Sequence, residues 1–399
     1  MPTLCCAGLM MLVAAMLNLV PAAQAQESQQ VGIVYLALSV NRVWPRSFLD
    51  QPPTDEGVQG ARLGLADNAT TGRFLHQTYH LQELLEPDAA SVLSAFRAAV
   101  AAGNHLFVVD LPAALLLQVA DLPEAQDGIL IDATDTDDVL RAEGCRRNVL
   151  HMLPSRAMLA DALMQYLIIK DWRRILLVVG PDPADQLYGD ALRRSAQKFQ
   201  IRIVADKPWT FKPGARRTDT GHFAVEAEVA RFTQGISYDV LVVADEGDNF
   251  GDDLSYHTTD PRPVAGTQGL TPSAWARPFE QWGATQLQNR FMRLAGRWPT
   301  DRDFGAWMAV RAIGEAAIRS GSVDPHVIIP FLHSKDFQLA AFKGERLTIR
   351  SWDGQLRQPV LLATDRALVS VSPQPGFLHQ FSELDTLGID QPETKCHMN

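Results

Sequence analysis

Four polar residues stand at or just after the ends of apolar stretches, and their side chains are suited to binding a small molecule. These residues are Asp110, Thr134, Asp135 and Glu246. A carboxylate can hold a cation or accept hydrogen bonds, and the Thr134 hydroxyl can donate to a ligand carboxylate. Other roles are open, because Thr134 or Asp135 can cap a helix and Glu246 can be a solvated loop residue.

Three further residues complete the set of candidate ligand contacts. Tyr188 can lay its ring against a ligand, or it can pack within its own part of the fold near the start of a helix. Gln268 can form hydrogen bonds to a ligand through its amide group. Trp44 can cover a ligand as part of a lid, or it can anchor its own loop.

Sequence motifs for catalysis and for metal binding are absent. The sequence contains no GxSxG turn, no GK[ST] phosphate loop, no GxGxxG after the first predicted strand and no CxxC pair. Acidic clusters at residues 132–138 and 245–253 lack the register of a calcium loop, and the histidines form no HExxH pair. We therefore expect a protein that is not an enzyme and that binds neither a metal nor a cofactor.

The candidate ligand residues are separated by a regular alternation of predicted strands and helices. The predicted strands cover residues 31–36, 77–81, 105–110, 128–132, 175–180, 201–205 and 240–244. The stretch Ile175–Val179 is apolar on both faces, as expected for a strand that is buried in a parallel sheet. Because ligands of such sheets bind beyond the carboxyl ends of the strands, the polar residues that follow these strands are placed where a ligand would lie.

The pattern predicts an α/β fold with two doubly wound Rossmann-like lobes, each with a central parallel sheet, joined by a hinge of several strands. We expect one lobe over residues 26–150 and about 270–340, and the other over 151–269 and about 341–375. Residues 342–359 read as a hairpin of the second lobe, with Asp353-Gly354 as its turn. Residues 376–399 are expected to be weakly structured. A cleft between two lobes is a favourable ligand site.

The composition and the first residues predict an exported protein. Residues 1–25 contain no charged side chain, and their apolar run ends before an Ala-Gln-Ala cleavage signal, which indicates a signal peptide and a periplasmic location. The formal net charge of −10 argues against a nucleic-acid partner. No later segment is suited to membrane insertion, and we expect a monomer. The two cysteines that remain after cleavage, Cys145 and Cys396, could pair in an oxidising compartment, but we expect Cys145 to be a small buried thiol.

Several segments, in their order and spacing, resemble a known family. The crossing Val149–Ser155, the Tyr188-Gly189 pair, the Ala-rich run Trp307–Ala317 and the turn at Asp353-Gly354 are similar to segments of type I periplasmic binding proteins of the branched-chain amino acid class. The resemblance covers nearly all of the mature chain. It implies a periplasmic binding protein-like fold and the substrate-binding component of an ABC importer, with permease subunits as partners and a small molecule as ligand.

A narrower resemblance involves residues 141–148, 155–158 and 171–172, which look like a subgroup associated with PQQ-dependent alcohol dehydrogenase systems. It implies a transport role beside periplasmic alcohol oxidation. The chain departs from amino-acid-binding members at 110–113, which lack a hydroxyl residue, and at Gln268, where many members carry an acid. An organic acid or an alcohol-derived metabolite therefore remains an open alternative to an amino acid. Alternative functions are a periplasmic sensor of the same fold and an accessory protein of a quinoprotein dehydrogenase.

Overall fold

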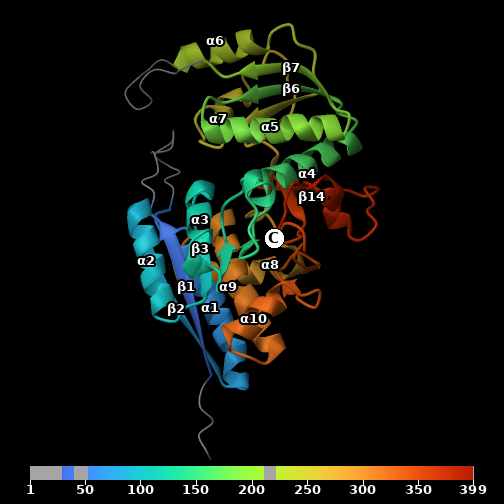
Figure 1. Cartoon of the computed structure of the whole chain (residues 1–399). Helices are drawn as coiled ribbons and strands as arrows, with labels where there is room; N and C mark the ends of the chain where they lie inside the picture. The colour runs from blue at the N-terminus through green and yellow to red at the C-terminus, as the bar shows by residue number, and fades with distance from the viewer. Residues whose placement is uncertain (1–28, 40–52, 211–221, 399) are drawn as a thin grey trace, which may run out of the picture.

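Two parallel β-sheets, each covered by helices on both faces, form the two lobes of the computed structural model (Figure 1). The structure describes residues 29–39, 53–210 and 222–398. The predicted signal peptide and Trp44 therefore lie outside the described residues. The prediction of a doubly wound α/β fold is confirmed, because the strands of both central sheets run parallel and are connected through helices.

The sheet of the first lobe has the strand order β2-β1-β3-β4-β5. Its strands are β1 (Gln29–Leu38), β2 (Gln77–Glu86), β3 (Leu106–Asp110), β4 (Ile129–Asp132) and β5 (Val149–His151). One face is covered by α1 (Val58–Gly72), α8 (Ala284–Ala295), α9 (Asp301–Ser320) and α10 (Pro325–Leu332), the other by α2 (Ala89–Ala101) and α3 (Ala113–Ala120). Ile33 and Val34 are buried on opposite faces, because successive strand residues point to opposite sides of a sheet.

The sheet of the second lobe has the strand order β7-β6-β8-β9. Its strands are β6 (Arg174–Val179), β7 (Arg202–Pro208), β8 (Val240–Ala244) and β9 (Val264–Gly266), and its helices are α4 (Arg156–Ile169), α5 (Pro183–Lys198), α6 (His222–Thr233) and α7 (Gly251–Leu254). Tyr188 lies within α5, near the start of the helix. Helix α5 begins at Pro183, since proline suits the first helical position and the Asp185 carboxylate accepts from the Asp182 amide.

Short strands and turns complete the chain at the hinge and the C-terminus. An antiparallel sheet consists of β10 (Thr271–Ser273), β13 (Val360–Ala363) and β14 (Leu368–Ser372), and β11 (Leu339–Ala340) pairs with β12 (Arg346–Leu347). The 3-10 turns are η1 (Arg73–Leu75), η2 (Pro123–Ala125), η3 (Asp138–Arg141), η4 (Gln281–Gly283), η5 (Glu383–Thr386) and η6 (Gln391–Glu393). The chain passes between the lobes after β5, near β10, before β13 and again after β14, where the C-terminal segment returns to the first lobe. Across the described ranges, no helix combines the length and apolar composition that a bilayer span requires.

The segment 342–359 packs with the first lobe, whereas we expected it in the second. Leu347 and Leu356 are buried in the hydrophobic cluster that surrounds α9, and Gln355 pairs with His151 at the end of β5. Strand β12 pairs with the preceding β11, and only a single bridge joins Ile349 to Leu356 across the turn. The burial of these leucines against α9 places the segment on the first lobe. The turn residues alone do not specify which lobe the segment packs against.

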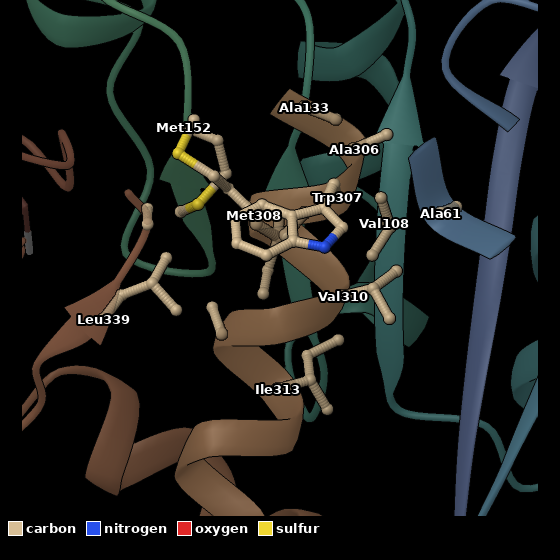
Figure 2. Close-up of a cluster of buried hydrophobic side chains, with 14 of the residues drawn as sticks. Ala61, Val108, Ala133, Met152, Ala306, Trp307, Met308, Val310, Ile313 and Leu339 are labelled. Atoms are coloured by element: carbon tan, nitrogen blue, oxygen red, sulfur yellow. The ribbon is translucent and has the colours of Figure 1, made fainter. Parts of the chain in front are cut away.

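Helix α9 runs through the core of the first lobe and supports the loop that follows β4 (Figure 2). Trp307 and Ile313 are buried along it, and Ala306 lies near Ala133. A Cβ atom added at Gly305 would stand 1.9 Å from the carbonyl oxygen of Ala133. The absence of a side chain at Gly305 therefore allows the helix to approach the segment that carries Thr134.

Substitution of Gly305 by alanine is expected to lower the free energy of unfolding by about 1–3 kcal/mol, because the methyl group would push α9 away from Ala133. Gly32→Ala is the matched control, since a Cβ there meets its nearest atom at an ordinary 3.4 Å. Urea unfolding of both variants measures the effect. Equal midpoints for the two variants would show that the contact is not tight.

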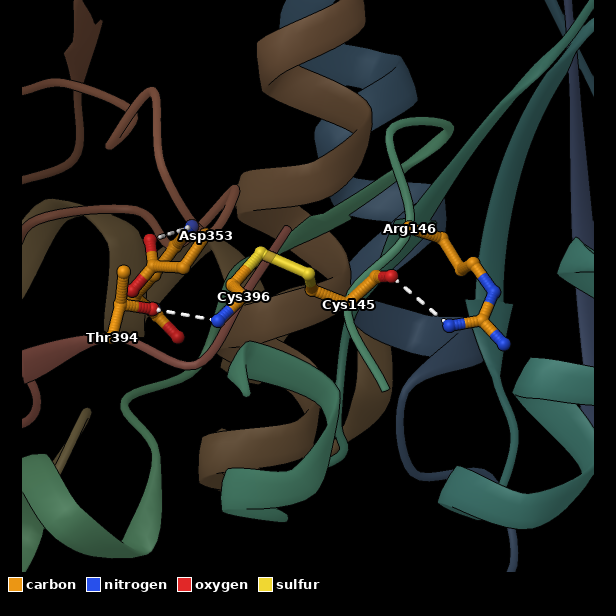
Figure 3. Close-up of a disulfide and its surroundings, with 6 residues drawn as sticks. Cys145, Arg146, Asp353, Thr394 and Cys396 are labelled. Carbon is orange, nitrogen blue, oxygen red and sulfur yellow. Dashed lines mark hydrogen bonds between the residues drawn. A yellow bond between two sulfur atoms is a disulfide. The ribbon is translucent and has the colours of Figure 1, made fainter. Parts of the chain in front are cut away.

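A disulfide joins Cys145 to Cys396 and corrects our expectation of a buried thiol (Figure 3). The Cα atoms are 5.6 Å apart although 251 residues separate the two positions in sequence. The pairing could not be inferred from the sequence, because it depends on the C-terminal segment returning to the loop before β5. The bond attaches the chain end to the first lobe.

The C-terminal segment, which we expected to be weakly structured, makes specific contacts with both lobes. The buried Arg350 donates to the Asp385 carboxylate at 2.8 Å and to the Leu387 carbonyl oxygen at 2.8 Å. On the second lobe, the Gly388 amide donates to the buried Asp161 at 2.9 Å. Together with the disulfide, these contacts hold residues 382–396 against both the first lobe and helix α4 of the second lobe.

Candidate functional site

A cavity of about 290 Å³ lies between the two lobes at the carboxyl ends of their strands. Its walls are formed by Leu38, Asp110, Leu111, Pro112, Thr134, Asp135, Thr136, Arg156, Glu246 and Arg302. The structure thus brings together Asp110, Thr134, Asp135 and Glu246, four of the residues singled out in the sequence. They meet because parallel strands end at the same edge of each sheet.

The Asp110 carboxylate is the centre of a hydrogen-bond network on the first-lobe wall. It accepts from the Thr134 hydroxyl at 2.7 Å and from the Tyr35 hydroxyl at 3.1 Å, and it forms an ion pair with Arg302. Burial and the adjacent Asp110 carboxylate raise the pKa of Tyr35 well above its usual value. Tyr35 is therefore a donor to Asp110 at neutral pH, and the Thr134 proton is directed into the wall rather than into the cavity.

Asp132, at the end of β4, holds the loop that carries Thr134 and Asp135. One of its carboxylate oxygens accepts from the backbone amides of Thr134 and Asp135 at 3.1 and 2.9 Å. The other accepts from His151 Nδ1 at 2.8 Å. Burial, reinforced by the Arg141 guanidinium, lowers the pKa of His151 to about 4 despite this contact. His151 is consequently neutral at pH 7, with its Nδ1 proton on the bond to Asp132.

Acidification from pH 6.5 to 4 is expected to weaken folding through His151 by about 2–3 kcal/mol, because the unfolded chain takes up the proton first. This contribution to stability is present above pH 6.5 and is lost as the pH falls toward the folded-state pKa. Urea unfolding at several pH values should show a shallower pH dependence for His151→Gln than for the wild type. His80→Gln, on the exposed side of β2, should keep the wild-type slope.

Asp135 lies on the wall of the cavity beside Thr134. One of its oxygens accepts from the Asp137 amide at 2.7 Å. Burial and the nearby Asp132 carboxylate raise the pKa of Asp135 to about 6. The group is therefore mostly ionised at pH 7, at an energetic cost that a positive ligand group would offset.

Arg156 and Glu246 form the second-lobe wall of the cavity. Nε and Nη2 of Arg156 donate to the two oxygens of Glu246 at 2.7 and 2.6 Å, and the side chains are 10% and 25% exposed. The Glu246 amide donates to Asp185 at 2.7 Å. Burial raises the pKa of Asp185 to about 6. This bidentate ion pair fixes both side chains on the second-lobe side of the cavity.

Two residues of the cavity wall, Arg156 and Arg302, were missed by sequence reasoning. Arg156 immediately follows Ser155, whose hydroxyl accepts from the Met158 amide and so caps α4. Its position at a helix start beyond the lobe crossing was a usable signal. Arg302 had no such signal, because it lies 192 residues from its partner Asp110 along the chain.

Tyr188 and Gln268 do not line the cavity. Tyr188 is 3% exposed and packs in the cluster between α4, α5 and the second sheet, which was the alternative role considered for it. Gln268 is bound within its own lobe, where its Nε2 donates to the Asp245 carbonyl oxygen and to Asp248, both at 3.3 Å. Neither side chain lies on the wall of the cavity in this conformation.

Outside the cleft, a further cavity and the acidic clusters were the other places where a site could lie. A cavity of about 340 Å³ beside the disulfide is larger than the cleft cavity, but its walls come from the loop before β5 and the chain end alone. Among the described residues, no group of three or more His, Cys, Asp or Glu side chains is arranged to hold a metal ion. Unlike the cavity beside the disulfide, the cleft cavity draws polar side chains from both lobes at the ends of their central strands.

Comparison with known proteins identifies the fold. No family model and no curated protein matches the sequence. A leucine-, isoleucine-, valine-, threonine- and alanine-binding protein from Brucella ovis, in a closed conformation, is 14% identical, with a TM-score of 0.67 over 93% of this chain and 99% of that chain. The fold is that of the type I periplasmic binding proteins.

Two further structures are similar to this chain, and one of them was solved with a ligand that is not an amino acid. A periplasmic binding protein from Burkholderia mallei is 14% identical, with a TM-score of 0.65 over 93% of this chain and 99% of that chain. A solute-binding protein of an ABC transporter from R. palustris, solved with benzoate, is 10% identical, with a TM-score of 0.63 over 93% of this chain and 100% of that chain. At this level of identity the type I fold is shared, while the ligand must be argued from the residues of the cavity.

Proposed function

We propose that this chain is the periplasmic substrate-binding component of an ABC importer and captures a small solute between its two lobes. The observation that carries the proposal is the composition of the cleft cavity. Asp110 and Thr134 enter it from the first lobe, and Arg156 and Glu246 enter it from the second. A solute in contact with both pairs stabilises the closed arrangement.

The mechanism is hinge closure. The lobes rotate about the connections that follow β5, join β9 to β10 and precede β13. A ligand shifts the equilibrium toward the closed state only by the contacts that it gains there. On closure, the Arg156–Glu246 pair of the second lobe would contact a ligand that is bound to Asp110 and its hydrogen-bond partners on the first lobe.

Hinge closure requires that the chain be divided into two lobes, each with its own core. In this proposal, residues 1–25 are a cleaved signal peptide that directs export. The first lobe comprises residues up to about 151 and about 274–356, which share the core around α9. The second comprises about 156–266, with β13 and β14 packed beneath α4. Permease subunits are the expected partners of the closed form.

The proposed link to PQQ-dependent alcohol oxidation rests on the resemblance of residues 141–148, 155–158 and 171–172. It predicts that cells without this protein grow poorly on alcohols because they no longer take up the solute. The quinoprotein dehydrogenase activity of their extracts should be unchanged. A fall in that activity would favour the accessory-protein alternative.

A ligand screen followed by a transport assay tests the proposed function. Amino acids, short organic acids, alcohols, amines and PQQ are screened for an increase in the melting temperature of the purified mature chain. A binding solute should also reduce the radius of gyration in X-ray scattering and be taken up by cells only when this chain is present. Chemical turnover of the solute, or binding without compaction and without any effect on uptake, would overturn the proposal. A sensor would compact in the same way but leave uptake unchanged.

A further inference from the structure

We propose that the cleft selects a small solute that carries a protonated amine and no carboxylate. This inference rests on the proposed function and names the ligand class of the same cavity. It follows from counting which hydrogen-bond donors and acceptors on the cavity wall are already used within the protein.

The donors that follow the strand ends, where a ligand carboxylate would bind, are occupied, and the Thr136 hydroxyl is the other neutral side-chain donor on the described wall. A threonine hydroxyl has one proton, and Thr134 gives it to Asp110 at 2.7 Å. The backbone amides of Thr134 and Asp135 both donate to Asp132, and the amide of Glu246 donates to Asp185. Each of these groups lies at the end of a strand, and each is directed into the protein.

The two guanidinium groups on the wall are also paired. Arg156 uses Nε and Nη2 on Glu246, and Arg302 is paired with Asp110. A ligand carboxylate bound to the remaining N–H groups of either arginine would lie beside the protein carboxylate that this arginine already holds. Like charges at this distance oppose binding, because the cavity is partly shielded from water.

Acceptors, in contrast, remain available. The described wall carries three carboxylates, Asp110, Asp135 and Glu246, against two guanidinium groups, Arg156 and Arg302, so its formal charge is −1 (2 − 3). Asp135 accepts through one oxygen from the Asp137 amide, and no described residue donates to the other. The Thr134 oxygen keeps a lone pair as well. Leu38, Leu111 and Pro112 offer apolar contacts for the carbon skeleton of the solute.

Asp135 is the residue expected to pair with the ammonium group. Its carboxylate is perturbed by burial and by Asp132, and a cation beside it would restore its ionised form. The charged groups that face it are Asp132, Asp137, Arg141 and Arg156. Because an alkylammonium group stays protonated below pH 9, affinity should follow the ionisation of Asp135. It should be roughly tenfold weaker at pH 5 than at pH 7.

Calorimetry with matched ligands tests the inference. For each of several carbon skeletons, the panel contains the amine, the amino acid, the carboxylic acid and the alcohol, for example 3-methylbutylamine, leucine, 3-methylbutanoate and 3-methylbutanol. The amine should bind at least tenfold more tightly than its three counterparts. Tighter binding of an amino acid or a carboxylic acid, or of an alcohol, would overturn the ligand class while leaving the solute-binding function intact.

Variants of the carboxylate separate the proposed contact from general charge effects. Asp135→Asn should weaken amine binding at least tenfold at pH 7 and remove its dependence on pH between 5 and 7. Asp127→Asn makes the same change of charge on an exposed loop and should leave both unchanged. Equal amine affinity in the wild type and Asp135→Asn would overturn the assignment. If no amine binds and other solutes of the wider screen do, the ligand class fails and the proposed function stands.

Discussion

Tyr188→Ala is expected to lower the free energy of unfolding of the second lobe by about 3–5 kcal/mol. The ring is 3% exposed and packs with residues of α4, α5 and β6, so its removal leaves a cavity that the rigid sheet cannot fill. Urea unfolding monitored by tryptophan fluorescence measures the loss. If Tyr188 were a ligand contact at the surface of the cleft, the substitution would instead weaken binding and leave stability nearly unchanged.

Tyr188→Phe is the matched control for that prediction. The Tyr188 hydroxyl is buried and has no hydrogen-bond partner among the described residues. Burial also raises the pKa of this group, which therefore stays protonated. Replacement by phenylalanine keeps the ring and removes an unpaired polar atom, so stability should stay the same or rise by about 1 kcal/mol. A marked loss would reveal a polar partner for the hydroxyl.

Removal of the disulfide is expected to lower the free energy of unfolding by about 2–4 kcal/mol. The bond between Cys145 and Cys396 closes a loop of most of the described chain, so its loss increases the conformational freedom of the unfolded state. The test is urea unfolding of the double variant Cys145→Ala/Cys396→Ala beside the oxidised wild type. The variant should also release the chain end to limited proteolysis.

Reductant provides the control for the disulfide prediction. It should lower the unfolding midpoint of the wild type toward that of the double variant and leave the double variant unaffected. Arg350 and its contacts with Asp385 and Leu387 remain in both proteins and should keep residues 382–388 protected from protease. Identical midpoints with and without the bond would show that these noncovalent contacts alone fix the C-terminal segment.

Much of the fold could be predicted because local pattern and strand ends carry the information. The run Ile175–Val179 is apolar on both faces only because it lies between two layers of helices. Asp110, Thr134 and Glu246 were singled out because they follow such strands, and the structure places them in one cavity. The hairpin at 342–359 was assigned to the wrong lobe, since turn residues specify a reversal of the chain but not the surface it packs on.

The sequence by itself determined the α/β architecture and the presence of Asp110, Thr134 and Glu246 at the cleft, because periodicity and the ends of parallel strands are local properties. The same reasoning failed for Tyr188 and Gln268, which are held within the second lobe. The tertiary structure alone decided that Arg302 pairs with Asp110, that Cys145 bonds to Cys396, and that the Thr134 proton is used within the wall. These outcomes depend on groups far apart in the chain. Hydrogen bonds and ion pairs act over a few ångströms of space, and sequence spacing does not encode which distant groups come within that range.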